Sequence, residues 1–248
     1  MKKSYIIIAI VVVLMIVAMG AYAIINNNSQ NKKQQENNTN VETTKDVNNT
    51  KESVQENNTE NQVANTQTNN ETNNESGENN MYSTGKHHAE IVVKNYGTIA
   101  LELDADVAPI TVENFANLVN EGFYNGLTFH RIISGFMIQG GDPLGNGTGG
   151  SSKTIKGEFA SNGVKNSISH VRGTISMARS SMPNSASSQF FIVHKDSTFL
   201  DGQYAAFGTV TSGMDVVDKI CADTAVEDDN GTVAKNNQPV IEKITMID

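Results

Sequence analysis

The stretch FHRIISGFMIQGGD at residues 129–142 decides the fold, because two short apolar runs meet in it at a Ser-Gly turn. Side chains alternate between the two faces of a β-strand, so Arg131 and Gln139 are predicted to lie on strands that also carry large apolar residues. A turn at Ser134 and Gly135 would let Arg131 fold back toward the same cleft. The pattern predicts hydrogen-bonding groups in an apolar groove beside a glycine loop. From these residues alone, an ordinary barrel strand and turn is the alternative interpretation.

A second stretch, SMARSSMPNSASSQFFIVHKDSTFLDGQYAAFG at residues 176–208, favours the groove. Together the two stretches closely resemble the signature motifs of the cyclophilin family of peptidyl-prolyl cis/trans isomerases, in the expected order and spacing. The resemblance extends over about residues 89–248. It implies a mainly β fold, a closed eight-stranded antiparallel β-barrel capped by two α-helices.

The resemblance also implies roles for individual residues. Arg131 matches the catalytic arginine, whose fixed charge would stabilise the prolyl nitrogen while the amide is twisted. The implied substrate-binding residues are Phe136, Met137, Phe191 and Leu200 in a proline pocket, Phe199 and Tyr204 at its rim, Gln139 on the substrate backbone, Ala178, Arg179 and Gln189 in the adjoining groove, and His130 in support of the arginine. The implied reaction needs no nucleophile, metal or cofactor.

The chain departs from many eukaryotic members of the family at the rim of this pocket. Those members carry tryptophan in place of Phe199 and histidine in place of Tyr204, whereas this chain contains no tryptophan. A phenylalanine lacks the indole N–H donor, which implies weaker cyclosporin binding. Ser134 replaces a proline and Arg179 an asparagine, and both changes bear on peptide preference.

The N-terminal residues 1–25 are predicted to form a transmembrane signal anchor. Residues 5–25 contain no charge and follow Lys2 and Lys3. As a helix, these 21 residues would span about 31 Å, the thickness of a bilayer's hydrocarbon core. The lysine pair favours a cytoplasmic N-terminus, so the remainder would lie outside the cell membrane. The alternative is a signal peptide cleaved near Ala23, which would release a secreted protein.

Residues 26–84 are predicted to be a disordered linker, because Asn, Thr, Gln and Glu dominate them and too few apolar residues are present to form a core. Residues 85–248 then form one isomerase domain. The net charge of −9 favours neither nucleic acid nor anionic lipid as a main partner. The partners expected are proline-containing polypeptides and, through the N-terminal segment, the lipid bilayer, with the protein a monomer.

Hydrophobic periodicity independently indicates many strands and two helices. A hairpin is predicted around the turn at residues 95–97, with further strands at residues 129–133, 136–139, 174–178, 190–193, 206–210 and 240–247. One helix is predicted from a cap at Thr111 to Gly122, and another after a cap at Ser212. Strands with two amphipathic helices are typical of a barrel with covered ends.

Several other features carry weaker functional interpretations. The glycines of residues 140–150 lack the strand-to-helix context of a phosphate loop, so a tight loop is predicted. His87 and His88 are adjacent, a spacing that does not favour a metal site. His170 and His194 are isolated in sequence, and the serines of residues 180–188 lack a His/Asp set. Cys221, the only cysteine, is predicted to be a buried helical residue.

The sequence therefore predicts a membrane-tethered isomerase that speeds the folding of secreted or surface proteins. A non-catalytic peptide-binding or assembly module on the same fold is the main alternative, and a structural surface protein with a spacer is a third. Retention of Arg131 with Gln139 favours the enzyme, since peptide binding alone does not require the cation.

The anchor interpretation predicts how the native chain fractionates. Full-length protein should pellet with membranes and be cut from intact protoplasts by added protease, because an exposed, uncovered linker is the preferred site of cleavage. Immunoblotting of the fractions measures this. A soluble form that begins near Ile24 would instead establish the cleaved signal peptide.

Overall fold

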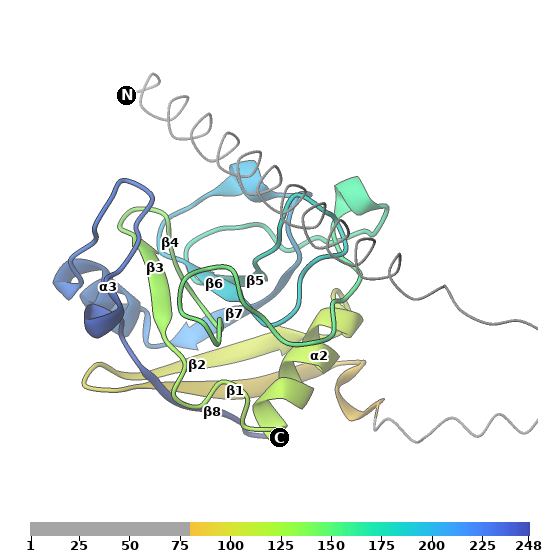
Figure 1. The fold of residues 1–248 in the computed structure, drawn as a ribbon. Coiled ribbons are helices and arrows are strands. Elements are labelled where there is room, and N and C mark those ends of the chain that lie inside the picture. Colours follow the sequence, from red (N-terminus) through yellow and green to blue (C-terminus); the bar gives the residue numbers. More distant parts are fainter. Residues whose placement is uncertain (1–79) are drawn as a thin grey trace, which may run out of the picture. The chain divides into compact units, whose positions relative to one another are not determined.

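The computed structural model describes residues 80–248, which form a mainly β half-barrel of eight antiparallel strands with two α-helices (Figure 1). The strand order across the sheet is β3-β4-β6-β5-β7-β2-β1-β8. The elements are β1 (Lys86–Val93), β2 (Gly97–Asp104), α2 (Pro109–Asn120), β3 (Phe129–Ile133), β4 (Met137–Gly140), β5 (Thr174–Met177), β6 (Phe190–Val193), β7 (Ala206–Ser212), α3 (Met214–Asp223) and β8 (Ile241–Met246), with 3-10 turns η1 (Asn80–Tyr82), η2 (Ala160–Asn162), η3 (Thr198–Leu200) and η4 (Lys235–Asn237).

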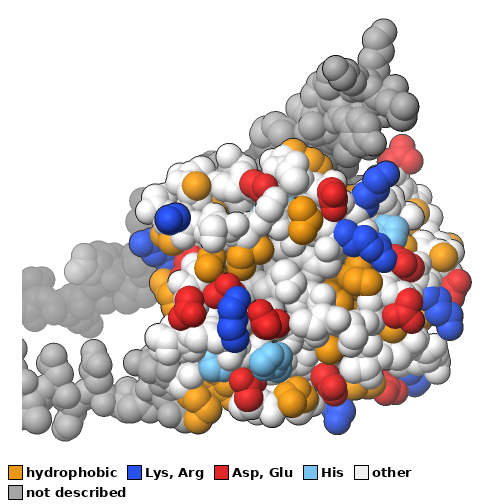
Figure 2. Space-filling view, turned by 180° about the vertical axis from the view of Figure 1, so that it is seen from behind, with side chains coloured by type: hydrophobic (Ala, Val, Ile, Leu, Met, Phe, Trp, Pro, Cys, Tyr) orange, Lys and Arg blue, Asp and Glu red, His pale blue; other side chains and the backbone are white. Residues whose placement is uncertain are grey.

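The predicted anchor at residues 1–25 and most of the predicted linker lie outside the described residues. Among residues 80–248, no helix combines the length and the apolar character that crossing a bilayer requires. Tyr82 lies within the segment assigned to the linker, yet its ring is buried in the core and Asn120 donates a 3.3 Å hydrogen bond to its hydroxyl. On the face that Figure 2 shows, acidic and basic side chains are interspersed.

The predicted strands are present, and the hairpin of β1 and β2 has the expected turn. Val93 pairs with Gly97 across residues 94–96, and Asn95 takes a left-handed conformation at φ 67°. The alternation is kept, because Ile91 and Ile99 are fully buried while their neighbours along the strands face outward. β3 and β6 have the bounds that the sequence predicts.

The prediction of a closed barrel is wrong: the sheet is open, with β3 and β8 as its two edges. Among residues 80–248, a single isolated bridge joins these edges, between Thr128 and Val240, the residues just before β3 and β8. Pro239 accepts a hydrogen bond from the Phe129 N–H at 2.9 Å, but proline has no N–H with which to continue a ladder. The edges therefore meet at their ends and do not pair along their lengths.

The predicted cap of the first helix is also wrong, because α2 begins at Pro109 and Thr111 lies inside it. The capping group is the buried carboxylate of Glu158. It accepts hydrogen bonds from the N–H of Ile110 at 3.1 Å and of Thr111 at 2.8 Å, and from the Thr111 hydroxyl at 2.6 Å. A carboxylate at this end of a helix also interacts favourably with the helix dipole. The loop that carries Glu158 is thereby fixed to α2.

The C-terminus of α2 follows the prediction, since Gly122 takes a left-handed φ of 70° and its N–H bonds the carbonyl of Val119. For α3 the predicted cap is wrong, because Ser212 ends β7 and Gly213 precedes the helix. A Cβ on Gly213 would lie 2.4 Å from the Thr98 carbonyl, which requires glycine there. Cys221 is buried in α3 as predicted, and burial raises the pKa of its thiol to about 11.

Two apolar clusters lie on opposite faces of the same strands. In β6, Phe190 and Ile192 belong to the large central core, whereas Phe191 and Val193 belong to a second, smaller cluster. The period of two along a strand produces this separation. The central core includes an aromatic set in which Phe115 lies 5.3 Å from Phe207 between ring centroids. The second cluster is therefore available to line a surface groove.

Substitution of Glu158 tests the cap. Glu158→Gln places an amide N–H₂ against backbone donors, so we expect the free energy of unfolding to fall by about 1.5–3 kcal/mol. Urea unfolding followed by circular dichroism measures the change. Glu121→Gln, at the exposed end of the same helix, should leave the stability within about 0.5 kcal/mol, and an equal loss in both variants would contradict the assigned cap.

Candidate active site

A groove of about 680 Å³ runs across the outer face of β3, β4 and β6. Its walls come from segments far apart in sequence: these three strands, the glycine loop after β4, the segment after β5, η3, and the segment before β8. Of the predicted site residues, the groove is lined by His130, Arg131, Phe136, Met137, Gln139, Ala178, Arg179, Gln189, Phe191, Leu200 and Tyr204. The fold thus brings almost the whole predicted set to one surface.

An apolar pocket occupies one part of this groove. Its buried residues are Phe136, Met137, Phe191 and Leu200, which belong to the second cluster together with Val193. Ala178 and Tyr204 pack against them from the edge, and the Tyr204 ring meets the Phe191 ring edge-on at 5.9 Å. Such a pocket is suited to a small apolar ring and excludes water from it.

Phe199 stands apart from the other predicted residues, because it does not line the groove. Its side chain is 53% exposed, and its ring lies 5.6 Å from that of Phe136 between centroids. The structure therefore places Phe199 at the outer rim of the apolar pocket.

A row of polar side chains crosses the groove beside the apolar pocket. Arg131 pairs with Gln139 in the β3–β4 register, and Gln139 pairs with Phe191 in the β4–β6 register. Arg131 Nη1 donates to Gln139 Oε1 at 3.2 Å, and Gln139 Nε2 donates to Gln189 Oε1 at 2.9 Å. Gln189 Nε2 in turn donates to the carbonyl of Gly149 at 2.7 Å. The row joins Arg131 to the glycine loop.

The guanidinium of Arg131 is held on two sides and open on a third. Its Nε donates to the backbone carbonyl of Asn230 at 2.8 Å and to Asn230 Oδ1 at 3.2 Å. Among residues 80–248, no hydrogen-bond acceptor contacts its Nη2. Burial lowers the pKa of Arg131, the charges of Tyr204 and Asp228 raise it, and a guanidinium stays protonated in proteins. A fixed positive charge therefore faces the groove.

Asn230 is a site residue that the sequence does not reveal. It lies 99 positions from Arg131, in a loop whose conformation is set by Asp228. Asp228 accepts hydrogen bonds from the N–H of Thr232 at 2.9 Å and from its hydroxyl at 2.8 Å. The Gly231 carbonyl receives the Ile132 N–H at 2.8 Å, which attaches the loop to β3. The loop thus presents the Asn230 carbonyl to the arginine.

His130 lies next to Arg131 but has a different environment. It is only 4% exposed, and neither ring nitrogen has a hydrogen-bond partner among the described residues. Burial lowers its pKa, Asp142 acts in the opposite direction, and Arg131 lowers it further, which favours the neutral ring at pH 7. The ring packs beside Gly147, where an added Cβ would lie 3.6 Å from Nε2. Its contact with the groove is one of packing.

Arg179 lines the groove, yet its charged end is directed to the protein's own backbone. Its Nε and Nη2 both donate to the Gln203 carbonyl, at 3.0 and 2.8 Å, and Nη1 donates to the Ser180 carbonyl at 2.9 Å. The guanidinium lies over the rings of Phe159 and Tyr204, at 4.9 and 4.8 Å from their centroids. Arg179 therefore fixes the Tyr204 wall.

The glycine loop after β4 is organised around Asp142, which is 1% exposed. Its carboxylate accepts hydrogen bonds from the N–H groups of Leu144 at 2.8 Å, Asn146 at 3.1 Å and Gly147 at 2.6 Å. Burial would raise the pKa of Asp142, but these amides, with that of Gly149, lower it below its usual value. The loop's own carboxylate occupies the amides that a phosphate would need, in agreement with the predicted tight loop.

Comparison with known proteins identifies the family to which the chain belongs. The family described as cyclophilin type peptidyl-prolyl cis-trans isomerase/CLD matches residues 88–246. The Helicobacter pylori (strain ATCC 700392 / 26695) peptidyl-prolyl cis-trans isomerase is 51% identical over 128 residues, which cover 51% of this chain and 76% of that protein. The Bacillus subtilis (strain 168) peptidyl-prolyl cis-trans isomerase B is 50% identical over 117 residues, or 47% of this chain and 78% of the relative.

A solved structure shares the fold. The Cryptosporidium parvum cyclophilin type peptidyl-prolyl cis-trans isomerase has a TM-score of 0.59 and 29% identity, and the match covers 66% of this chain and 99% of that one. An open antiparallel sheet with two helices is thus the fold that this chain shares with a solved isomerase. The chain belongs to the cyclophilin-type peptidyl-prolyl cis-trans isomerase family, and its activity is that of a peptidyl-prolyl cis-trans isomerase.

The loop that holds Arg131 is open to a direct test at Gly231. Gly231 has a φ of 81°, and a Cβ there would lie 2.3 Å from the Ile132 carbonyl, so Gly231→Ala must displace the loop. We expect catalytic efficiency to fall by about tenfold or more, since small misplacements of a catalytic group are costly. A protease-coupled isomerisation assay measures this.

Gly163→Ala is the matched control for that experiment. Gly163 also has a positive φ, of 76°, but nothing lies within 4 Å of an added Cβ. It should share the backbone strain of Gly231→Ala and keep the activity. An equal loss of activity in both variants would show that strain alone, and not the position of the Asn230 carbonyl, is responsible.

Proposed function

We propose that the groove binds an Xaa-Pro segment with the proline ring in the apolar pocket and the prolyl nitrogen beside Arg131. The observation that carries this proposal is the state of the arginine. Two of its nitrogens are fixed by Asn230 and Gln139, while Nη2 is left without an acceptor among the described residues at the edge of the pocket. A solved relative, 31% identical, was crystallised in the presence of the dipeptide Ala-Pro, which supports a proline-containing ligand.

The catalytic problem is the partial double bond of the amide. Rotation about an Xaa-Pro bond faces a barrier of about 18–20 kcal/mol, so uncatalysed exchange takes tens to hundreds of seconds. An acceleration of about five decades requires a barrier lower by roughly 7 kcal/mol. That free energy must come from interactions that are stronger in the twisted amide than in the planar one.

Two features of the groove meet this requirement in the proposed mechanism. Twisting the amide removes conjugation and localises the lone pair on the prolyl nitrogen, which then accepts a hydrogen bond from the Arg131 guanidinium. The pocket around Phe191 and Leu200 excludes water, so this charge-assisted interaction is stronger than it would be in solvent. The planar ground state offers no comparable lone pair, and the stabilisation is therefore specific to the transition state.

The glutamine row is suited to hold the substrate backbone during rotation. Gln139 uses one amide hydrogen on Gln189 and its oxygen on Arg131. One N–H of Gln139 remains for a substrate carbonyl, because a primary amide has two donors. We assign Arg179 a different role from that implied by the family motif: it shapes the groove through Tyr204, since its donors already bond the carbonyls of Gln203 and Ser180.

For the full chain we propose a membrane-tethered enzyme whose domain lies outside the cell membrane and acts on secreted or surface proteins. The uncharged residues 5–25 after Lys2 and Lys3 support the anchor, and the polar linker supports reach to varied clients. All four prolines of the chain lie within residues 85–248, at Pro109, Pro143, Pro183 and Pro239. The tether therefore offers no Xaa-Pro bond of its own to the groove.

Arg131→Ala tests the proposed mechanism. We expect catalytic efficiency to fall by about 10²–10³, the scale seen when one charge-stabilising donor is removed. Binding of a proline peptide, measured by calorimetry, should weaken far less, because the lost interaction belongs to the transition state. Circular dichroism checks that the variant is folded.

The matched control is Arg172→Ala, which removes an exposed arginine bonded to Asp218 at 2.8 Å outside the groove. Its activity should stay within about twofold of wild type, as expected of a surface ion pair. Wild-type activity in a folded Arg131→Ala variant would contradict the role of Arg131 and favour a groove that catalyses by binding alone.

A further inference from the structure

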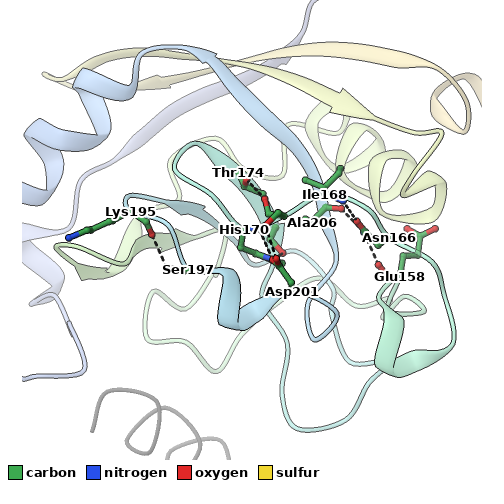
Figure 3. A network of polar contacts seen from close by, with 11 residues as sticks. Glu158, Asn166, Ile168, His170, Thr174, Lys195, Ser197, Asp201 and Ala206 are labelled. Atoms are coloured by element: carbon green, nitrogen blue, oxygen red, sulfur yellow. Dashed lines mark hydrogen bonds and ion pairs between the residues drawn. The ribbon is translucent and has the colours of Figure 1, made fainter. Parts of the chain in front are cut away.

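The polar network drawn in Figure 3 includes the buried His170, whose ring stacks on Phe191 of the apolar pocket. His170 is 1% exposed. Its backbone N–H and both of its ring nitrogens have hydrogen-bond partners within the protein. Its backbone N–H donates to Asp201 Oδ1 at 2.7 Å, its Nδ1 lies 2.9 Å from the same oxygen, and its Nε2 lies 3.0 Å from Ser176 Oγ. The ring is therefore fixed at both ends.

The hydrogen-bond partners determine the tautomer of His170. Burial would raise the pKa of Asp201, but the Ser169 hydroxyl and the His170 N–H groups lower it, so the carboxylate is ionised and only accepts. Nδ1 must then carry the proton, and Nε2 must accept the Ser176 hydroxyl proton. Burial lowers the pKa of His170, while Asp201 acts in the opposite direction, and the neutral ring is favoured at pH 7.

The order Ser176, His170, Asp201 is that of a hydrolytic triad, but the geometry does not serve hydrolysis. Ser176 is fully buried in β5, and Ser176 does not line the groove. A nucleophile needs an approach for the substrate carbonyl, which is lacking at this position. The cluster must act on the protein itself.

Each partner of His170 either lines the pocket or adjoins a residue that does. The imidazole stacks on Phe191, with centroids 6.0 Å apart and planes at 16°, and it meets the Tyr204 ring edge-on at 6.5 Å. Asp201 directly follows Leu200 at the end of η3. Ser176 is the register partner of Phe191 across β5 and β6. One imidazole thus contacts two aromatic residues of the pocket directly, Phe191 and Tyr204, and reaches the segment that carries Leu200 through its hydrogen bond to Asp201.

We propose that His170 is a positioning residue for isomerisation, which holds Phe191, Leu200 and Tyr204 at the separation that fits a proline ring. The proposal rests on the proposed assignment of this pocket to proline. The neutral ring does this by accepting from Ser176 and donating to Asp201 at the same time.

The proposal predicts a sharp difference between two substitutions in the full chain. His170→Phe keeps an aromatic ring against Phe191 but loses both hydrogen bonds, so we expect KM for a proline peptide to rise about tenfold at pH 7.5 with kcat within about threefold. Ser176→Ala removes one bond and should raise KM less. The variant that carries both substitutions should have the same KM as His170→Phe alone, because each substitution removes the hydrogen bond between Ser176 and His170.

Glu158→Gln is the control for stability, since it weakens a buried polar cluster at α2, outside the groove. It should leave KM unchanged, with rates normalised to the folded fraction from circular dichroism. A wild-type KM in folded His170→Phe would overturn the proposal. So would a rise in KM of equal size in Glu158→Gln, because the effect would then follow stability alone.

A pH titration supplies a readout that a purely structural role would not give. Burial lowers the pKa of His170 from its ordinary value, and below that pKa the ring gains a proton on Nε2 and no longer accepts from Ser176. The charged and titratable groups that face it are Asp201 and Tyr204, with Arg179 beyond the Tyr204 ring. NMR signals of the Met137 and Leu200 methyl groups should shift further in wild type than in His170→Phe as the pH is lowered from 7.5.

This comparison isolates one histidine, because the buried His130 titrates in both proteins. Identical methyl shifts in wild type and His170→Phe would count against the proposal. A fourth variant, Phe191→Leu, separates the two levels of inference. If Phe191→Leu leaves KM unchanged, the assignment of the pocket to proline fails; if Phe191→Leu raises KM and His170→Phe does not, only the role of His170 fails.

Discussion

The register of β4 between β3 and β6 is the constraint on which the rest of the site depends. It places Arg131 opposite Gln139 and Gln139 opposite Phe191, so that charge, amide and aromatic ring lie in one row. A slip of one residue would turn each of these side chains into the core and expose Ile138 or Phe190 instead. The core prevents this slip, because Phe190 packs among Phe115, Tyr124 and Phe129. Burial on one face thus fixes the chemistry of the other.

Around this row, two loops fix the positions of side chains that the strands alone do not fix. The arginine is aligned by Asn230, from a loop that Asp228 shapes, and the glycine loop is shaped by Asp142. In both loops a carboxylate accepts several backbone N–H groups and so replaces secondary structure locally. The barrel's open edge has a related consequence. Because β3 and β8 do not pair along their lengths, residues 231–233 bond to β3, and residues 232–235 with Gln238 form one wall of the groove.

Much of the fold and of the site follows from the sequence. The strands at residues 129–133 and 190–193 were predictable because alternation and turn residues are local signals. Most residues that line the groove were named in advance because two motifs of the sequence resemble those of a known family. The failures share a cause: Thr111 and Ser212 are plausible caps by residue type, but the distant Glu158 carboxylate and the close approach of Gly213 to Thr98 decide the helix starts. Capping preferences that are read from the local sequence cannot account for partners that lie far away in the chain.

The sequence by itself determined the pattern of strands, the identity of the reactive groups and the character of the pocket, because these depend on residue type and short spacing. Only the tertiary structure decided which partners hold those groups. Asn230 lies 99 residues from Arg131, and Asp201 lies 31 from His170, and neither pairing leaves a periodic trace. The tertiary structure also decided that Arg179 donates to backbone carbonyls and that the sheet stays open. Hydrogen bonds between distant loops depend on where the whole chain packs, and packing is a property of the fold and not of any one segment.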